Sequence, residues 1–344
     1  MNYPRPGRKL NACAGSQQGL TLIELMVALV VGLLIVAAMS MLFAGSSRSR
    51  REVELSADVI ENGRYALDVL NRELSQTGFY GSLVTPVAAA TAIDTPTKVA
   101  TAMCLTTVAN IAAWQDSLSY YAMGLRSASG ANVDADPTCV ARKVGTDALF
   151  VQRANTCAIG DADCQAESNS SAYLQVSECG TEYSTAATRI VVARGTSSAF
   201  TLQTKACDGA TRAPKRKLVR RIYFVSAANE LSYQELPISG SLPAAVVLVE
   251  GIEQMQIEYA VDSTGDGTPD TFEASPSDWT QVIGARVWLL ARSSDISRNT
   301  KDAASFVLGA DTTVSVAASA SGNLKRRAYS TYVPFVTPKA RRES

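Results

Sequence analysis

Two hydrophobic patterns follow one another near the start of the chain. The twenty residues from Leu25 to Ala44 carry no charge, and as a helix they would span about 30 Å, the thickness of a bilayer hydrocarbon core. Beyond Arg51, apolar residues recur every three or four positions, or at sums of these, as in an amphipathic helix. The predicted buried stripe comprises Val53, Ala57, Ile60, Leu67, Leu70 and Leu74. The two patterns predict one helix from about Thr21 to Thr77, half of it in a membrane.

The rest of the chain consists mainly of short apolar or alternating segments separated by turn-forming residues, which predicts β-strands. Few helical patterns intervene, so we expect an antiparallel sheet and an α+β fold. The predicted strands lie at residues 148–151, 173–176, 189–193, 218–226, 230–236, 246–249, 254–261, 281–292, 306–308, 312–317 and 326–336. Residues 338–344 are basic and predict a frayed tail.

Composition argues against several classes of function. The chain has 32 basic and 32 acidic residues, so it lacks the basic excess typical of nucleic-acid-binding proteins. It has no histidine, which excludes Ser-His-Asp and Cys-His catalysis. No pair of carboxylates is distinguished from ordinary surface acids. We therefore do not expect an enzyme.

Seven cysteines divide into one near the start and six further along. Cys13 precedes the apolar run, and the others are Cys104, Cys139, Cys157, Cys164, Cys179 and Cys207. An even set suits three disulfides in an oxidising compartment, although the sequence does not determine the pairing. The short spacing makes Cys157 with Cys164 the first candidate for a local pair. Free or metal-bound thiols are the alternative, but no Cys-x-x-Cys pair supports zinc.

The junction in front of the apolar run is distinctive. Residues 1–19 contain Arg5, Arg8 and Lys9, no acid and no apolar core, unlike an ordinary secretory signal. The junction reads Gly19-Leu20-Thr21-Leu22-Ile23-Glu24-Leu25-Met26. A basic leader ending in Gly, then an apolar segment with Glu at its fifth position, resembles the class III signal of type IV prepilins and type II secretion pseudopilins. The alternative is a single-span anchor whose basic end stays in the cytoplasm.

The resemblance implies specific processing. A prepilin peptidase would cut after Gly19 and methylate the new amino terminus at Leu20, where the family usually has Phe. The apolar helix would then serve as membrane anchor and later as filament core. Glu24 would be the fifth-position acid, and an ionisable group at the edge of a membrane helix is costly unless it is paired. We expect it to neutralise the new terminal amine of an adjacent subunit during assembly.

Later segments resemble the PilW-type minor pilins, which are related to the J-type minor pseudopilins of type II secretion. The matching segments are residues 62–67, 72–74, 78–81, 145–149 and 326–331, with Trp279 and Arg286. The resemblance implies a pilin-like α+β fold, with a leader at 1–19, a long helix at 20–77 that spans the membrane at about 25–44, and a β-rich periplasmic domain at 78–344. Disulfides would staple residues 101–208 of that domain.

The function implied by the resemblance is structural. A PilW-type subunit would prime assembly of a type IV pilus from the bacterial inner membrane and sit at or near the pilus tip. Its partners would be the prepilin peptidase, other minor pilins, the major pilin, the inner-membrane assembly platform and a tip adhesin. A J-type pseudopilin at the tip of a type II secretion pseudopilus is the alternative, although the long globular part favours PilW.

One segment has the spacing of a calcium site. Residues 262–273 place acids at positions 1, 5, 9 and 12 and glycine at position 6, as in an EF-hand loop. The candidate ligands are Asp262, Thr264, Asp266, Thr268, Asp270 and Glu273, with calcium as the cofactor. Thr264 stands where an acid or amide is usual, and strands rather than helices flank the segment. The alternative is a strand connection built from turn-forming residues with solvated acids.

A basic cluster lies at Lys215, Arg216, Lys217, Arg220 and Arg221. It could contact DNA or an acidic partner. We favour the simpler interpretation that these residues are a solvated strand edge, whose charges discourage pairing with other strands.

Overall fold

The computed structural model describes residues 19, 21–83, 117–125, 140–185, 189–238, 242–310 and 312–343. The chain forms two compact units, Met1–Glu54 and Leu55–Ser344. Helix α1 (Leu22–Ser75) contributes to both. Of the described helices, α1 is the one long and apolar enough to span a membrane. Short helices η2 (Ser117–Ser119), α4 (Gly180–Tyr183) and η3 (Trp279–Gln281) and the C-terminal α6 (Val336–Glu343) complete the helical elements.

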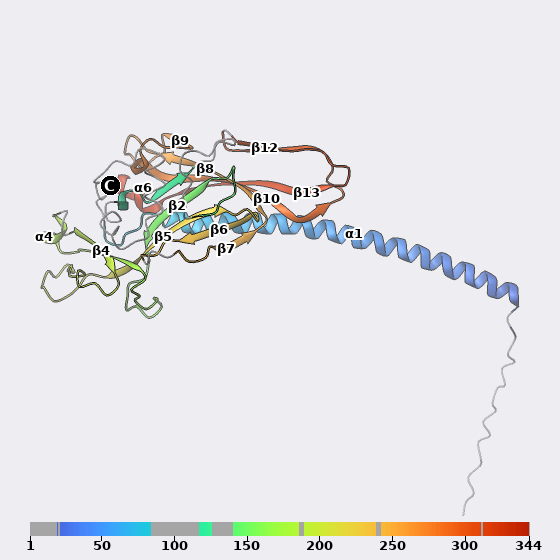
Figure 1. The fold of residues 1–344 in the computed structure, drawn as a ribbon, viewed down its shortest axis with the longest axis horizontal. Coiled ribbons are helices and arrows are strands. Elements are labelled where there is room, and N and C mark those ends of the chain that lie inside the picture. The colour runs from blue at the N-terminus through green and yellow to red at the C-terminus, as the bar shows by residue number, and fades with distance from the viewer. Residues whose placement is uncertain are drawn as a thin grey trace, which may run out of the picture. The chain divides into compact units, whose positions relative to one another are not determined.

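The larger sheet has seven strands in the order β1-β2-β5-β3-β4, with β6 joining β5 to β7 (Figure 1). Strand β5 is its centre, because it pairs with β2, β3 and β6. The strands are β1 (Ala122–Leu125), β2 (Ala148–Ala154), β3 (Ala172–Val176), β4 (Ile190–Arg194), β5 (Lys215–Val225), β6 (Glu230–Glu235) and β7 (Val246–Glu250).

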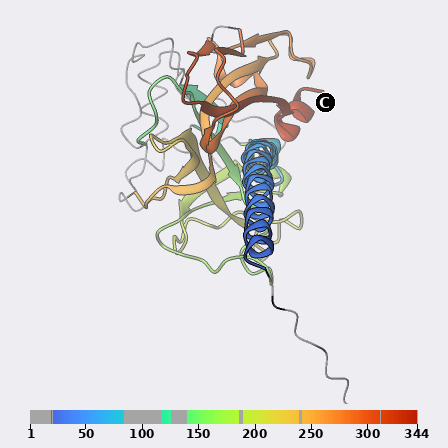
Figure 2. The same cartoon turned by 90° about the vertical axis from the view of Figure 1, so that its right-hand side faces the viewer.

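A second sheet has the order β13-β10-β8-β9, and a separate hairpin pairs β11 with β12. Figures 1 and 2 show these later strands, orange to red, grouped apart from the green and yellow strands of the larger sheet. The strands are β8 (Ile252–Val261), β9 (Thr271–Glu273), β10 (Val282–Ser297), β11 (Ala304–Leu308), β12 (Thr312–Val316) and β13 (Asn323–Pro334).

All the described strand pairs are antiparallel. A long apolar helix followed by an antiparallel, β-rich domain confirms the predicted α+β, pilin-like fold. Strands β1 and β9 were not predicted, and both are very short. The predicted frayed tail is wrong, because residues 336–343 form α6.

The buried stripe of α1 contains Leu70 and Leu74 as predicted but differs from the prediction at its other positions. It consists of Leu55, Val59, Gly63, Ala66, Leu70 and Leu74, whereas Ile60 is 37% exposed and Val53 is 65% exposed. The reason is a close approach to β13, where a Cβ on Gly63 would lie 2.2 Å from Cε2 of Tyr329. The hydroxyl of Tyr329 donates to the main-chain oxygen of Val59 at 3.2 Å. Small residues therefore decide which face of the helix is buried.

The basic cluster on β5 is an interior feature rather than a solvated edge. Arg221 pairs with Glu73 of α1 at 3.2 Å, and Arg153 of β2 pairs with the same carboxylate at 3.4 Å. Lys217 pairs with Glu235 at 2.8 Å. Arg220 is 1% exposed, with its guanidinium over the Phe150 ring. The edge interpretation is therefore wrong, and two of these cations, Arg221 and Arg153, connect α1 to the larger sheet through Glu73.

Two arginines of helix α6 hydrogen-bond to main-chain oxygens in other parts of the domain. Arg341 donates to the main-chain oxygens of Leu83 and Gly78, each at 3.2 Å. Arg342 donates to the main-chain oxygens of Asp262 at 2.7 Å and Thr280 at 2.8 Å. The C-terminus thus links the segment after α1 to the loops that flank β9 and β10.

Candidate functional site

The N-terminal end of α1 is built around Thr21 and Glu24. The amide of Glu24 donates to Oγ1 of Thr21 at 3.4 Å, and Oγ1 of Thr21 donates to Oε2 of Glu24 at 3.4 Å. The first contact is one half of a capping box, in which the side chain of a Thr before the first turn accepts from the amide of a Glu three residues later. In place of the second half, the carboxylate of Glu24 accepts from the hydroxyl of Thr21 rather than from its amide. The carboxylate of Glu24 is therefore held at the very start of the helix, and its side chain remains exposed.

The processing residues lie directly in front of this cap. Gly19 is exposed, and no atom lies within 4 Å of the position a Cβ would take there. Leu20, the predicted methylated residue, lies outside the described residues. The predicted cleavage point therefore precedes the helix by two residues, and Glu24 follows the predicted new terminus by four positions in the sequence.

The following turns of α1 present apolar side chains on every side. Exposed fractions run from 48% at Val31 to 78% at Phe43. The hydroxyl of Ser40 donates a hydrogen bond to the main-chain oxygen of Val36 at 2.8 Å. This polar group is therefore satisfied within the helix and needs no water as a partner. Side chains this apolar are unfavourable in water and suit hydrocarbon or the apolar surfaces of other helices.

The 262–273 segment is a tight turn held by its own acids. Asp262 is fully buried, and it accepts from the amides of Gly265 at 2.6 Å and Gly267 at 3.0 Å. Asp270 accepts from the amide and hydroxyl of Ser263 at 2.8 and 2.7 Å. Asp266 accepts from the hydroxyl of Thr268 at 2.6 Å. These carboxylates are therefore occupied by donors of the turn itself.

Arg342 completes this arrangement, with its Nη1 3.3 Å from Oδ2 of Asp262. Burial alone would raise the pKa of Asp262, but the amides of Gly267 and Gly265, with Arg342, outweigh it and lower the pKa. Across the described residues, no group of three or more acidic, cysteine or histidine side chains is arranged to hold a metal ion.

The other predicted calcium ligands are also held within the turn or strand. Thr264 donates to Asp262 at 3.3 Å, and Glu273 lies on β9, where it accepts from Thr271 at 2.8 Å. Calcium binding stays a prediction, and it would require the ion to displace Arg342 from Asp262.

Two disulfides cross-link the chain segment between β2 and β5. Cys157 pairs with Cys164, as their short spacing suggests, and Cys179 pairs with Cys207 across β4. Cys104 and Cys139 lie outside the described residues, so the prediction of a third disulfide rests on the sequence alone.

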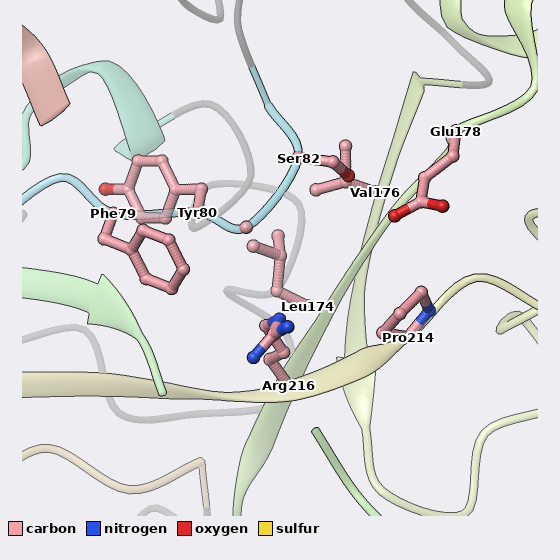
Figure 3. Close-up of a pocket in the computed structure, with 9 residues that line it drawn as sticks. Phe79, Tyr80, Ser82, Leu174, Val176, Glu178, Pro214 and Arg216 are labelled. Carbon is pink, nitrogen blue, oxygen red and sulfur yellow. The ribbon is translucent and has the colours of Figure 1, made fainter. Parts of the chain in front are cut away.

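A pocket of about 120 Å³ lies between the segment after α1 and strand β3 (Figure 3). Its wall is formed by Phe79, Tyr80, Gly81, Ser82, Leu174, Val176, Glu178, Pro214 and Arg216. The guanidinium of Arg216 donates to the main-chain oxygens of Asn155 and Thr156 and lies over the Phe79 ring. Arg216 therefore positions the turn after β2, and we assign the pocket no chemistry.

Sequence reasoning missed two residues of these sites. Thr21 could have been found, because Thr-x-x-Glu in front of an apolar run is the sequence signature of a capping box. Arg342 could not, since its partner Asp262 is 80 residues away in the chain and no local pattern joins them.

Two family models match the chain. One, described as type IV pilus-assembly protein W (PilW), matches residues 222–336, and the other, the prokaryotic N-terminal methylation motif, matches residues 15–40. No curated protein and no solved structure matches it. The first match covers the last four residues of β5 and all of β6 to β13, and the second covers the junction around Gly19 and the start of α1.

Proposed function

Because the chain is a type IV pilin-related protein with an N-terminal methylation motif and a PilW domain, we propose that it is a minor pilin that primes pilus assembly and sits at or near the pilus tip. The observation that carries the proposal is the occurrence of both matches in one chain, with an apolar helix that begins at Leu22, just beyond the predicted cleavage point. Its role is structural rather than enzymatic, which agrees with the absence of histidine from the sequence.

The apolar helix supports a place in the bacterial inner membrane, with the β-rich domain in the periplasm before the subunit enters the filament. Two disulfides in the described part of this domain suit that oxidising compartment. Its proposed partners are the prepilin peptidase, other minor pilins, the major pilin, the assembly platform and a tip adhesin.

Glu24 is the residue that we propose sets the register between subunits. After cleavage, the amine of Leu20 has a reference pKa of about 7.7 to 8.0 and is largely cationic at neutral pH. A carboxylate held at the first turn of a neighbouring helix can neutralise it away from water. Leaving one member of such a buried pair alone costs about 3 to 5 kcal/mol, so subunits in the wrong register are disfavoured.

The test compares two substitutions in the full chain, expressed in its own cells. Glu24→Ala removes both the cap and the charge, whereas Glu24→Gln keeps a side chain that can complete a capping box and removes only the charge. We expect both variants to be cleaved at Gly19, which a mobility shift reports, and both to lose co-purification with other pilins and assembly into sheared pili.

The two variants separate the possible roles of Glu24. If Glu24→Gln assembles normally while Glu24→Ala does not, the residue acts by capping the helix and the charge pairing is wrong. Normal piliation in a strain that lacks the whole chain refutes the minor-pilin proposal. The same strain, scored for secretion of folded proteins, tests the J-type alternative, which the PilW match does not favour.

A further inference from the structure

Strand β13 leaves one side of the second sheet open. Among the described strands the sheet order is β13-β10-β8-β9, so β13 pairs with β10 on one side only. At twelve residues β13 is long, whereas the edge strands β1, β4, β7 and β9 have three to five residues each. A long open edge presents a row of main-chain donors and acceptors to any strand that can reach it.

The register identifies which residues of β13 face outward. The amide of Phe335 donates to the oxygen of Ile283 at 2.8 Å, which makes these two residues a hydrogen-bonded antiparallel pair. Such pairs alternate along a ladder, so Val333, Thr331 and Tyr329 direct their main-chain groups to β10. The N–H and C=O groups of Ala328, Ser330 and Tyr332 therefore point away from the sheet. Pro334, which has no N–H, also falls on an outward position, consistent with this alternation.

These outward groups have no partner in the part of the chain that the structure describes. Among the described strands β13 has only β10 as a ladder partner, and outside the ladders the main chain of Ala328, Ser330 and Tyr332 forms no hydrogen bond with another described main-chain group. All three residues are exposed. The devices that usually protect an edge are limited to its start, where Lys325 donates to Ser56 at 2.7 Å and Arg326 pairs with Glu253 at 2.6 Å. From Ala328 to Val333 the strand carries no charge, and its proline, Pro334, lies beyond that stretch.

We propose that this edge accepts a strand from a different subunit of the same assembly, which adds to β13 through main-chain hydrogen bonds. Strand addition of this kind takes its affinity from the backbone and its specificity from alternate side chains. The contact follows from the edge itself, while the identity of the partner as another pilus subunit rests on the proposed function.

A second copy of this chain does not fit the edge. Strand β13 carries Lys325, Arg326 and Arg327 but no acid, so a second copy of it offers no carboxylate to Arg327 in either strand direction. A partner strand that contains an acid can pair with this arginine, since opposite charges on neighbouring strands are stabilising.

The side chains along the edge indicate which residues the partner strand should carry. Arg327 lies over the Tyr329 ring at 5.6 Å, and among the described residues it has no carboxylate partner, so a carboxylate is expected opposite it. Tyr332 packs edge-on against Phe272 at 5.6 Å, and Arg286 lies 3.9 Å from the centre of that ring. An aromatic or aliphatic side chain on the partner would extend this cluster. Small side chains suit the position next to Ser330.

The first experiment maps the edge in cells. A photoreactive amino acid is placed at Ala328 of the full-length chain, and the matched control carries it at Thr313, an exposed position on the β11–β12 hairpin. We expect irradiation to join the Ala328 variant, but not the Thr313 variant, to another pilus subunit. An adduct between two copies of this chain would overturn the choice of partner, and no adduct at Ala328 would overturn the proposal.

The second experiment tests whether the contact is a main-chain ladder. Ser330→Pro, combined with the photoreactive residue at Ala328, removes an N–H that β10 does not use, so the fold should persist; Ser330→Thr is the control. We expect at least a tenfold loss of adduct with proline and little change with threonine. An unchanged adduct with proline refutes strand addition. The adduct is read independently of piliation, so normal pili in the deletion strain would refute the proposed function without deciding this contact.

Discussion

Replacing Arg342 with alanine should destabilise the β-rich domain by about 2 to 3 kcal/mol. The side chain makes two hydrogen bonds, to the oxygens of Asp262 and Thr280, and its Nη1 lies 3.3 Å from the carboxylate of Asp262. Hydrogen bonds to a charged group contribute roughly 1.5 to 3 kcal/mol each. Arg342 is 22% exposed, so water recovers part of the loss, and Asp262 keeps its amide donors.

The assay is urea unfolding of the full-length protein in detergent, followed by tryptophan fluorescence, to which buried Trp279 beside Thr280 contributes. The matched control is Arg298→Ala, an exposed arginine whose removal should change the free energy of unfolding by less than about 0.5 kcal/mol. If Arg342→Ala lowers the free energy of unfolding no more than Arg298→Ala does, the contacts of Arg342 do not stabilise the domain and the reasoning is refuted.

The ion pair between Arg342 and Asp262 also predicts that the stability of the domain depends on pH. The folded-state pKa of Asp262 is lowered, so its stabilisation is complete above the unfolded value of about 3.9 and is lost as the pH falls through the folded value. The free energies of unfolding of wild type and Arg342→Ala should therefore differ most at pH 7, and this difference should become smaller below about pH 4. A constant difference from pH 7 to pH 2 would show that the ion pair contributes nothing.

Two further outcomes test the packing and the disulfides. Gly63→Ala should destabilise the domain by about 1 to 3 kcal/mol, because the new Cβ would meet the Tyr329 ring at 2.2 Å; an unchanged urea midpoint would contradict the close approach of α1 and β13. Removing the Cys179–Cys207 disulfide, which closes the longer loop, should lower the free energy of unfolding by roughly 3.6 kcal/mol, against roughly 2.5 kcal/mol for Cys157–Cys164. Denaturant unfolding of the two double-serine variants measures both losses. A larger loss for Cys157–Cys164 would contradict the loop-length argument.

Local chemistry allowed much of this protein to be predicted. The uncharged run from Leu25 to Ala44, the junction at Gly19 and the acid at Glu24 are all encoded in adjacent residues, so no distant contact was needed to predict an apolar anchor and, in front of it, the N-terminal methylation motif that the family model also matches. All the described strands except β1 and β9 were predicted for the same reason, because alternation and turn-forming residues act within a few positions. The pairing of Cys157 with Cys164 followed from their separation alone.

Only the tertiary structure decided how these elements meet. The periodicity of α1 predicted a helix and the burial of Leu70 and Leu74 correctly but missed the rest of the buried face, since Gly63 and Ala66 carry too little apolar surface to mark a stripe and Tyr329 packs over Gly63. Likewise, Arg221 looks like a surface cation until α1 brings Glu73 to it. The acids of the 262–273 turn have calcium-loop spacing, yet their oxygens are taken by the turn's own amides and by Arg342. Spacing along a chain specifies local geometry, whereas burial and pairing depend on residues far apart in sequence.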